Sequence, residues 1–218
     1  MKRVKNDVVV YAEGGGYSDD LRSEFRQAFA KLFEKTELGT TNRPRIVACG
    51  SRNQALSDFC CAIKQKRNAL LLVDSEAPIN CAHQQASKDE NDPWANFKPW
   101  AHLLERDNWE QPDCSTEKDC HLMVQCMESW FLADWKAVED FFGQGFKANV
   151  NLAGNIELIE KDAIFLALKK ATENCKTKAA YGKSQHSFKL LALVDPSKVF
   201  AASTWAMRFI VELKKRKT

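Results

Sequence analysis

The chain has 218 residues, of which 44% are hydrophobic and 28% are charged, and its formal net charge is +3. This composition is typical of a globular protein that buries a sizeable core, and the small net charge alone gives no indication of nucleic-acid binding. No stretch approaches the roughly 20 apolar residues of a membrane span, and the N-terminal residues do not form a signal peptide. We therefore expect a cytoplasmic protein that does not associate with a membrane.

In the first half of the chain, segments typical of strands alternate with segments typical of helices. Continuous apolar runs predict strands at residues 7–13, 44–50 and 68–76. Apolar residues at helical spacing predict helices at residues 18–35 and 51–66. Buried strands separated by helices indicate a parallel sheet that is covered on both faces.

The second half begins after a long polar segment, residues 77–119, which prolines interrupt and in which we expect one short helix near residues 100–106. A fourth strand is predicted at residues 121–125 and a helix at residues 127–143. Two further amphipathic helices follow. Their apolar residues run from Ile164 to Cys175 and from Val199 to Leu213.

These segments together predict a single α/β domain. Residues 1–142 would form the core that contains the parallel sheet, and residues 143–218 would form a helical part packed on it.

The eight cysteines are expected to be reduced, because the sequence has no export signal. One group of cysteine and histidine residues has the look of a metal site but contains no C-x-x-C pair, so structural zinc is not favoured. The group consists of Cys114, Cys120, His121 and Cys126.

Three acidic residues follow the apolar cores of two predicted strands. Glu13 ends the first strand, and Asp74 and Glu76 end the third. Ligands of open parallel sheets gather at the carboxyl ends of the strands, and residues two apart on a strand face the same side. If these strands are neighbours, the carboxylates converge, and a hard cation bound through oxygen relieves their repulsion. The pattern therefore predicts a Mg²⁺ or Mn²⁺ site.

A run of three glycines, Gly14 to Gly16, follows Glu13 and precedes a helix, as in a phosphate-binding loop. The P-loop pattern is incomplete because no Lys-Ser/Thr pair follows, and the G-x-G-x-x-G pattern fails at Asp19. Glu13 would repel a bare phosphate. The sequence therefore favours a phosphate that arrives through a metal ion.

Arg52 begins the second predicted helix, where a cation is unfavourable against the helix dipole. This position indicates an anionic partner such as a substrate phosphate, and a solvated arginine is the alternative.

Four stretches of the sequence carry a resemblance to a known family. They are VYAEGGGYSDDL, LLLVDSEAP, HLMVQCMESWFLAD and YGKSQHSFKLLALVDPSKV. They look like a small bacterial family of Toprim-related proteins of unknown function, whose genes are often found beside ATPase genes in phage-defence loci. The Glu-Gly and Asp-x-acid signature also resembles the Toprim domain of topoisomerases, primases and OLD-type nucleases. The resemblance covers most of the chain and implies a Toprim-like sheet, a nucleic-acid substrate and an ATPase partner.

The resemblance also implies site residues in the second half of the chain. Glu128 matches a Glu that related nuclease-like families carry at this helix start, where it would be an added ligand or a water-positioning base. Lys183 and His186 resemble positions where nuclease relatives place a cation over the scissile phosphate. From the residues alone, a helix-terminal acid, a surface lysine and a helix-capping histidine are the alternatives.

Two other features are each open to two interpretations. Trp94, Trp100 and Trp109 either pack the polar segment down or present a surface to a partner. The basic run at residues 214–218 is either a solvated end or a contact for a nucleic-acid backbone.

Two function hypotheses follow. The first is a Mg²⁺- or Mn²⁺-dependent phosphodiesterase, a nuclease for DNA or RNA in anti-phage defence, acting with a partner ATPase. The second is a non-catalytic or regulatory Toprim-like subunit that binds an ATPase, since the chain has no Walker motif of its own. The common Toprim pattern is Asp-x-Asp, whereas this chain has Glu76 at the second acidic position. The Glu side chain is one methylene longer, so this ligand would sit differently, and the resemblance implies metal binding more strongly than efficient catalysis. Both hypotheses allow a homo-oligomer.

Overall fold

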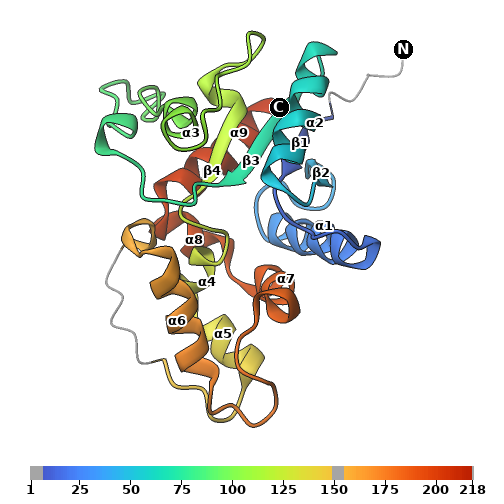
Figure 1. The fold of residues 1–218 in the computed structure, drawn as a ribbon, viewed down its shortest axis with the longest axis vertical. Coiled ribbons are helices and arrows are strands. Elements are labelled where there is room, and N and C mark those ends of the chain that lie inside the picture. Colours follow the sequence, from blue (N-terminus) through green and yellow to red (C-terminus); the bar gives the residue numbers. More distant parts are fainter. Residues whose placement is uncertain (1–6, 149–154, 218) are drawn as a thin grey trace.

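In the computed structural model, which describes residues 7–148 and 155–217, parallel strands form one four-stranded sheet in the order β2-β1-β3-β4 (Figure 1). The strands are β1 (Val9–Ala12), β2 (Arg45–Ala48), β3 (Ala69–Asp74) and β4 (Cys120–Met123). Every residue of β1, β3 and β4 is buried, as expected of parallel strands covered on both faces. The predicted α/β class and parallel sheet are confirmed.

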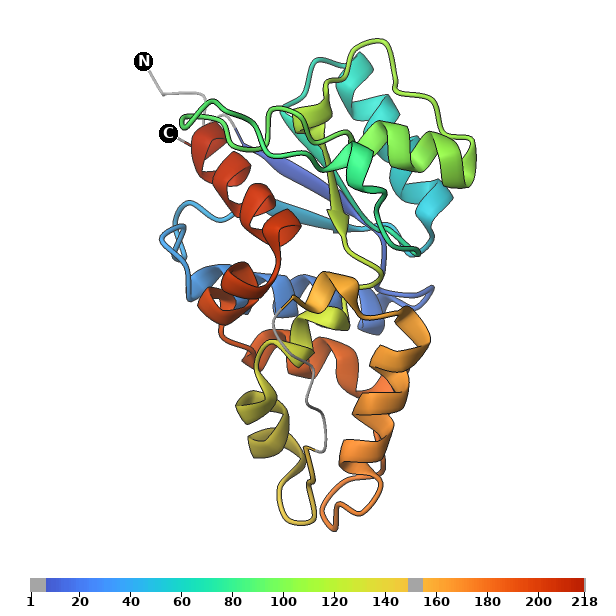
Figure 2. The ribbon, with the colours of Figure 1, turned by 90° about the vertical axis from the view of Figure 1, so that its left-hand side faces the viewer.

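Alternate strand residues divide the core into two apolar layers, one on each face of the sheet. Val10 and Leu72 belong to one layer, and Tyr11 and Leu71 belong to the other. The covering helices are α1 (Asp19–Glu34), α2 (Arg52–Lys64) and α3 (Pro99–Asp107). Figure 2 shows α1 on one side of the sheet and α2 with α3 on the other.

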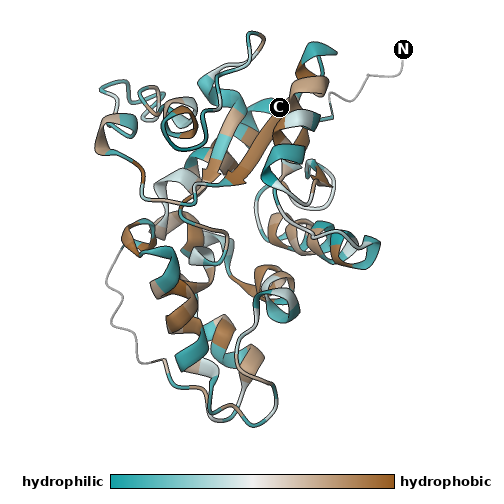
Figure 3. Cartoon of the chain, viewed as in Figure 1, coloured by the Kyte–Doolittle hydropathy of each residue, from teal (hydrophilic) through white to brown (hydrophobic). Residues whose placement is uncertain are grey.

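The part of the chain that follows β4 is helical, as predicted. Its helices are α4 (Ser129–Leu132), α5 (Trp135–Phe142), α6 (Lys161–Thr172), α7 (Lys183–Leu193), α8 (Pro196–Ala202) and α9 (Thr204–Lys217). Short 3-10 turns lie at Cys81–His83, Glu117–Asp119 and Ile156–Leu158. Helix α7 packs on α1, and α9 packs on β4. The helical part therefore contacts both the edge strand of the sheet and the helix that covers one of its faces. Figure 3 shows apolar strands and helices with mixed apolar and polar sides.

Asp134 interrupts the helix predicted at residues 127–143. Its backbone is non-helical, with φ −134° and ψ 68°, and it separates α4 from α5. Its carboxylate accepts a hydrogen bond from the backbone N of Asp195 at 2.9 Å and pairs with Lys198 at 2.5 Å. These partners lie near the start of α8, so a local periodic pattern could not reveal the break.

Ser203 similarly divides the helix predicted between Val199 and Leu213 into α8 and α9. The buried carboxylate of Glu157 accepts hydrogen bonds from Ser203 Oγ at 2.6 Å and from the backbone N of Trp205 at 2.9 Å. A residue distant in sequence therefore caps α9. Helix α7 has no counterpart among the predicted helices, because its first turn is polar and gives no apolar periodicity.

The segment between β3 and β4 packs onto the sheet. It contains the predicted short helix, expected near residues 100–106 and observed as α3. Trp100 is buried, and its Nε1 donates a hydrogen bond to the carbonyl of Thr116 at 3.0 Å. Arg52 lies over the ring of Trp109, 4.9 Å from its centroid, and Trp94 is partly buried in the same layer. These contacts favour the packing interpretation of the tryptophans.

The basic run near the C-terminus forms the last turn of α9 and is paired with the protein's own acids. Lys214 pairs with Glu37 at 2.7 Å, and Arg216 pairs with Asp119 at 2.7 Å. These ion pairs favour a helix end held on the fold over a free contact for nucleic acid.

All eight cysteines are free. Within residues 7–148 and 155–217, the only group of three or more potential ligands that could hold one ion is acidic, so the cysteine and histidine residues considered for zinc do not converge there. No helix in these ranges combines the length and apolar character needed to cross a membrane.

Loss of the Glu157 carboxylate should destabilise the fold, because two donors at the start of α9 would lose their acceptor in a buried place. We expect Glu157→Ala to lower the free energy of unfolding by about 2 kcal/mol in urea titrations. Glu160→Ala is the control, since Glu160 is exposed and makes no capping hydrogen bond, and it should change the free energy by less than about 0.5 kcal/mol. Equal unfolding midpoints for the two variants would contradict the capping role.

Candidate metal centre

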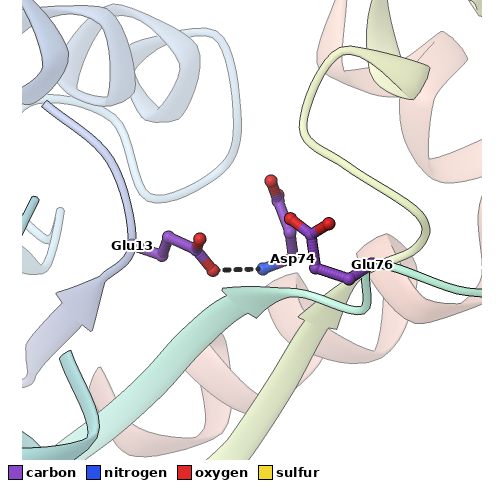
Figure 4. A group of neighbouring side chains, drawn as sticks. All are labelled: Glu13, Asp74 and Glu76. Atoms are coloured by element: carbon purple, nitrogen blue, oxygen red, sulfur yellow. Dashed lines mark hydrogen bonds between the residues drawn. The ribbon is translucent and has the colours of Figure 1, made fainter. Parts of the chain in front are cut away.

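The carboxyl ends of β1 and β3 bring the three predicted acids together. The two strands are neighbours, and Glu13, directly after β1, continues their pairing through a hydrogen bond from its N to the carbonyl of Leu72 at 2.9 Å. Asp74 is the last residue of β3. Carboxylate oxygens of Glu13, Asp74 and Glu76 all lie within 4.8 Å of one another (Figure 4).

Glu76 reaches this group through a turn of the backbone and not through the pleat of the strand. Strand β3 ends at Asp74, and Glu76 has a left-handed φ of 62°. Its N–H donates to the carbonyl of Gln125 at 3.0 Å, while Ser75 Oγ accepts a hydrogen bond from the N of Gln125 at 2.7 Å. The segment after β4 therefore fixes a conformation that is uncommon for a residue other than glycine.

Arg52 lies against the acids, where it holds two of them in place. Its Nη1 donates to Glu13 Oε2 at 3.2 Å and to the carbonyl of Asp74, and its Nη2 donates to Asp107 Oδ2 at 2.5 Å. The anionic partner expected for Arg52 is thus found within the chain. These bonds use three of the five N–H donors of the guanidinium, so Arg52 holds the acids in place. Its predicted role in binding a substrate phosphate stays a prediction.

Glu76 has two cationic partners that sequence reasoning missed. Lys161 pairs with Glu76 Oε2, and Arg106 lies 3.9 Å from the same oxygen. A signal for Lys161 was present, because it is the first residue of α6, as Arg52 and Lys183 are of α2 and α7. A cation in the first turn opposes the helix dipole and thereby indicates a nearby acid.

Glu128 is fully buried, and its two oxygens have different surroundings. Oε1 accepts a hydrogen bond from Ser187 Oγ at 3.0 Å and lies 3.6 Å from Lys183 Nζ. Ser187 Oγ also lies 2.7 Å from the hydroxyl of Tyr181, which donates to it because the proton of Ser187 is used on Glu128. Oε2 is buried without a hydrogen-bond partner in the described part of the chain. An orphaned carboxylate oxygen is costly to bury and indicates a missing partner.

His186 lies apart from this group. Its Nδ1 accepts a hydrogen bond from the N of Gly182 at 3.0 Å, and its ring contacts Phe142 with centroids 5.0 Å apart. Burial lowers the pKa of its imidazole. These contacts favour the helix-capping interpretation of His186, which is not among the residues that line the pocket at the acids.

The charges in the group shift one another's proton affinities. Burial, and then the charges of Glu13 and Glu128, raise the pKa of the Asp74 carboxyl well above its ordinary value. Burial also raises the pKa of Glu13, against the opposing effect of Arg52. Burial alone would lower the pKa of Lys183, but the charges of Glu128 and Asp74 outweigh it and raise that pKa. Burial is thus the main cause of the raised pKa values of the two acids, and the charges of neighbouring acids add to it for Asp74.

A pocket of about 460 Å³ gives access to the group. Its charged lining consists of Glu13, Asp74, Glu128 and Lys183. The side chain of Lys183 is 56% exposed, so its ammonium can move within the mouth of the pocket. The arrangement can bind a cation through oxygen ligands and can place a positive charge beside it.

Comparisons with known proteins gave one match. The family model described as "Domain of unknown function (DUF4276)" matches residues 12–214, a range that contains every residue of the candidate site. No curated protein and no solved structure matched the chain.

Removing the charge of Asp74 should stabilise the metal-free protein at neutral pH. The raised pKa means that the folded protein retains a proton that the unfolded chain releases, so the parent loses stability as pH rises through the folded-state pKa. Asp74→Asn avoids this loss and keeps an oxygen to accept the hydrogen bond from the N of Met127. We expect its melting temperature at pH 7.5 to exceed that of the parent by about 3 °C or more.

This difference should vanish below about pH 3.9, where the carboxyl is protonated in both states. Asp140→Asn is the control, because Asp140 is exposed on α5 and should change the melting temperature little at either pH. A lower melting temperature for Asp74→Asn than for the parent at pH 7.5 would contradict the raised pKa.

Proposed function

Because the chain belongs to the DUF4276 family, whose description states no function, we propose a function from the site itself: a divalent-metal-dependent phosphodiesterase that acts as a nuclease. The observation that carries the proposal is the convergence of three carboxylates together with the buried Glu128, which lines the same pocket as Glu13 and Asp74. Oε2 of Glu128 has no hydrogen-bond partner among the described residues. Acids alone are common at protein surfaces, and the orphaned oxygen supplies the independent sign of a ligand.

The donor set fits a hard divalent cation such as Mg²⁺ or Mn²⁺. The ligand atoms would be carboxylate oxygens of Glu13, Asp74 and Glu76, which such ions prefer. A bound cation would lower the raised pKa values of the Glu13 and Asp74 carboxyls, because an opposite charge nearby favours their charged form. When bound, the ion would neutralise a substrate phosphate and make a water molecule more acidic.

The remaining charged residues suit the steps of phosphodiester hydrolysis. Glu128 Oε2 would accept a proton from the attacking water, and the hydrogen bond from Ser187 would hold the carboxylate in position. Lys183 would place its ammonium against the phosphate as negative charge develops there. Both side chains line the same pocket as Glu13 and Asp74, which makes their cooperation geometrically reasonable.

The biological setting of the proposal rests on the resemblance to Toprim-related proteins of phage-defence loci. That resemblance supports a role in anti-phage defence, with DNA or RNA as the substrate and an ATPase as the partner. The sequence has no Walker motif, so any ATP-driven step would belong to the partner chain.

One observation favours a second candidate, a non-catalytic subunit that binds an ATPase. Glu13 already pairs with Arg52, and Glu76 already pairs with Lys161 and Arg106. If these ion pairs persist in solution, they satisfy much of the charge that a metal ion would otherwise neutralise. The two candidates therefore differ in two measurable quantities, the affinity of the chain for a divalent ion and its ability to cut nucleic acid.

Calorimetric titration with Mn²⁺ tests the site directly. We expect the parent to bind Mn²⁺ and the double variant Glu13→Gln, Asp74→Asn to lose this binding, because two carboxylate ligands become neutral amides. Asp140→Asn is the control, since it removes an exposed acid of α5 and should bind as the parent does. Equal binding by the parent and a folded double variant would reject the metal centre.

Loss of Lys183 should reduce turnover much more than substrate affinity, because its charge would act mainly in the transition state. We expect Lys183→Ala to cut labelled DNA or RNA about a hundredfold more slowly in single-turnover assays with Mn²⁺. Lys183→Arg should recover little, because a planar fork replaces a compact ammonium poorly.

The assay is run on the chain alone and with any ATPase that is encoded beside its gene. Lys189→Ala is the matched control, because Lys189 is also exposed on α7 but lies outside the pocket. Parental turnover by Lys183→Ala alongside an inactive Asp74→Asn would remove Lys183 from the mechanism. A parent that binds Mn²⁺ and cuts nothing under either condition would favour the non-catalytic candidate.

A further inference from the structure

The pocket over the acids has two unlike walls, and only the charged one is used by the proposed chemistry. The other wall is apolar and comes from α1, α7 and the segment after β4. It consists of Leu21, Phe25, Met127 and Phe188. Resting on the proposed function, we propose that this wall seats the base of a single nucleotide whose phosphate faces the acids.

Phe188 is the main element of the wall that a ligand can reach. Phe25 is almost fully buried, and its ring meets the ring of Phe188 edge to face, with centroids 5.3 Å apart and an interplanar angle of 82°. Phe188 itself is only partly buried, as is Leu21 on the facing helix. Nucleobases bind to aromatic and apolar side chains of this kind through stacking, with little dependence on sequence.

The glycine loop lies between the two walls. Gly14 pairs with Gly50 through two backbone hydrogen bonds of 3.0 and 2.8 Å, whereas the N–H groups of Gly15 and Gly16 make no hydrogen bond within the described residues. A Cβ at Gly14 would lie 2.6 Å from the ring of Phe25, so only glycine lets the loop approach the apolar wall this closely. Gly15 and Gly16 line the pocket, so in this proposal their N–H groups would donate to the sugar or phosphate oxygens of the nucleotide.

The size of the pocket limits what can enter it. A volume of about 460 Å³ is in the range of sites for small molecules and cofactors. A base inside a duplex is stacked and paired, and enzymes reach it only by taking it out of the helix. The class of substrate is therefore a nucleotide with an unstacked base, which either a free mononucleotide or the end of a single strand supplies.

Helix α7 contributes to both walls of the pocket, which suits a nucleotide. Lys183 and Ser184 begin α7 on the charged side, and Phe188 follows one turn later on the apolar side. Ser184 and Phe188 are four apart and lie on one face of α7, and Lys183 lines the same pocket. Helix α7 therefore presents both a cation and an aromatic ring to this pocket. A nucleotide has the same two parts, an anion joined to a planar ring.

Binding of deoxyadenosine monophosphate, measured by calorimetry in Mn²⁺, tests the proposal without requiring cleavage. The comparison ligand is 2-deoxyribose 5-phosphate, which has the sugar and phosphate but no base. We expect the parent to bind the nucleotide at least about tenfold more tightly, and Phe188→Ala to remove most of this preference. Equal affinities for the two ligands in the parent would overturn the proposal.

Two further variants keep the test decisive. Phe188→Leu preserves apolar volume in case Phe188→Ala fails to fold, and it should reduce the preference for the base by a smaller factor. Leu193→Ala is the matched control, an exposed apolar residue on the same helix outside the pocket, and it should retain the full preference. A folded Phe188→Leu or Phe188→Ala with the parental preference would overturn the proposal.

Competition experiments distinguish the two sources of the nucleotide. If a 5′-phosphorylated single-stranded trinucleotide displaces deoxyadenosine monophosphate, the apolar wall binds the end of a strand. If the trinucleotide does not compete, the wall binds a free nucleotide. A blunt duplex that competes as well as the single strand would overturn the requirement for an unstacked base.

Failure of this inference can be told apart from failure of the proposed function. Base-dependent binding without cleavage of any nucleic acid would uphold the seat and reject the nuclease. Cleavage of nucleic acid, with equal affinity for deoxyadenosine monophosphate and 2-deoxyribose 5-phosphate, would uphold the nuclease and reject the base-binding wall.

Discussion

Mutual repulsion among carboxylates at the end of β1 and β3 is the interaction around which the rest of the structure is arranged. Parallel pairing of the two strands places Glu13 beside Asp74, and the turn at Glu76 adds a third acid. Four helices contribute cations that pair with Glu13, Glu76 or the neighbouring Glu128. These cations are Arg52 of α2, Arg106 of α3, Lys161 of α6 and Lys183 of α7. Because these helices come from both halves of the chain, the ion pairs also connect the two halves.

The cations do not neutralise all acids equally. Glu76 is close to two cations, whereas Glu128 keeps one oxygen without any partner in the described residues. A divalent ion would have to compete with Lys161 for Glu76 but would meet no such competitor at Glu128 Oε2. The Glu76 side chain thus serves a lysine as well as the group of acids. Glu13, Asp74 and Glu76 are therefore not equivalent members of the site.

The sequence was sufficient for features that depend on local pattern. Apolar runs located the strands, and acids at the ends of two runs located the site, because parallel strands bring their carboxyl ends to one edge. It was insufficient where distant residues decide the local conformation. Asp134 breaks a helix through contacts near α8, and Glu157 starts another through Ser203. The convergence of Glu76 was predicted for a reason that proved wrong, since a left-handed turn held by Gln125 replaces the pleat.

The return of α9 to β4 has a consequence for the modularity of the protein. β4 is an edge strand, and α9 packs on it with Trp205 in one apolar layer and Phe209 in the other. A fragment ending near Gly143 would uncover this edge and both apolar layers, which is a surface prone to aggregation. It would also leave Glu128 without Ser187 and Glu76 without Lys161. We therefore expect the sheet to fold only together with the helices that follow it.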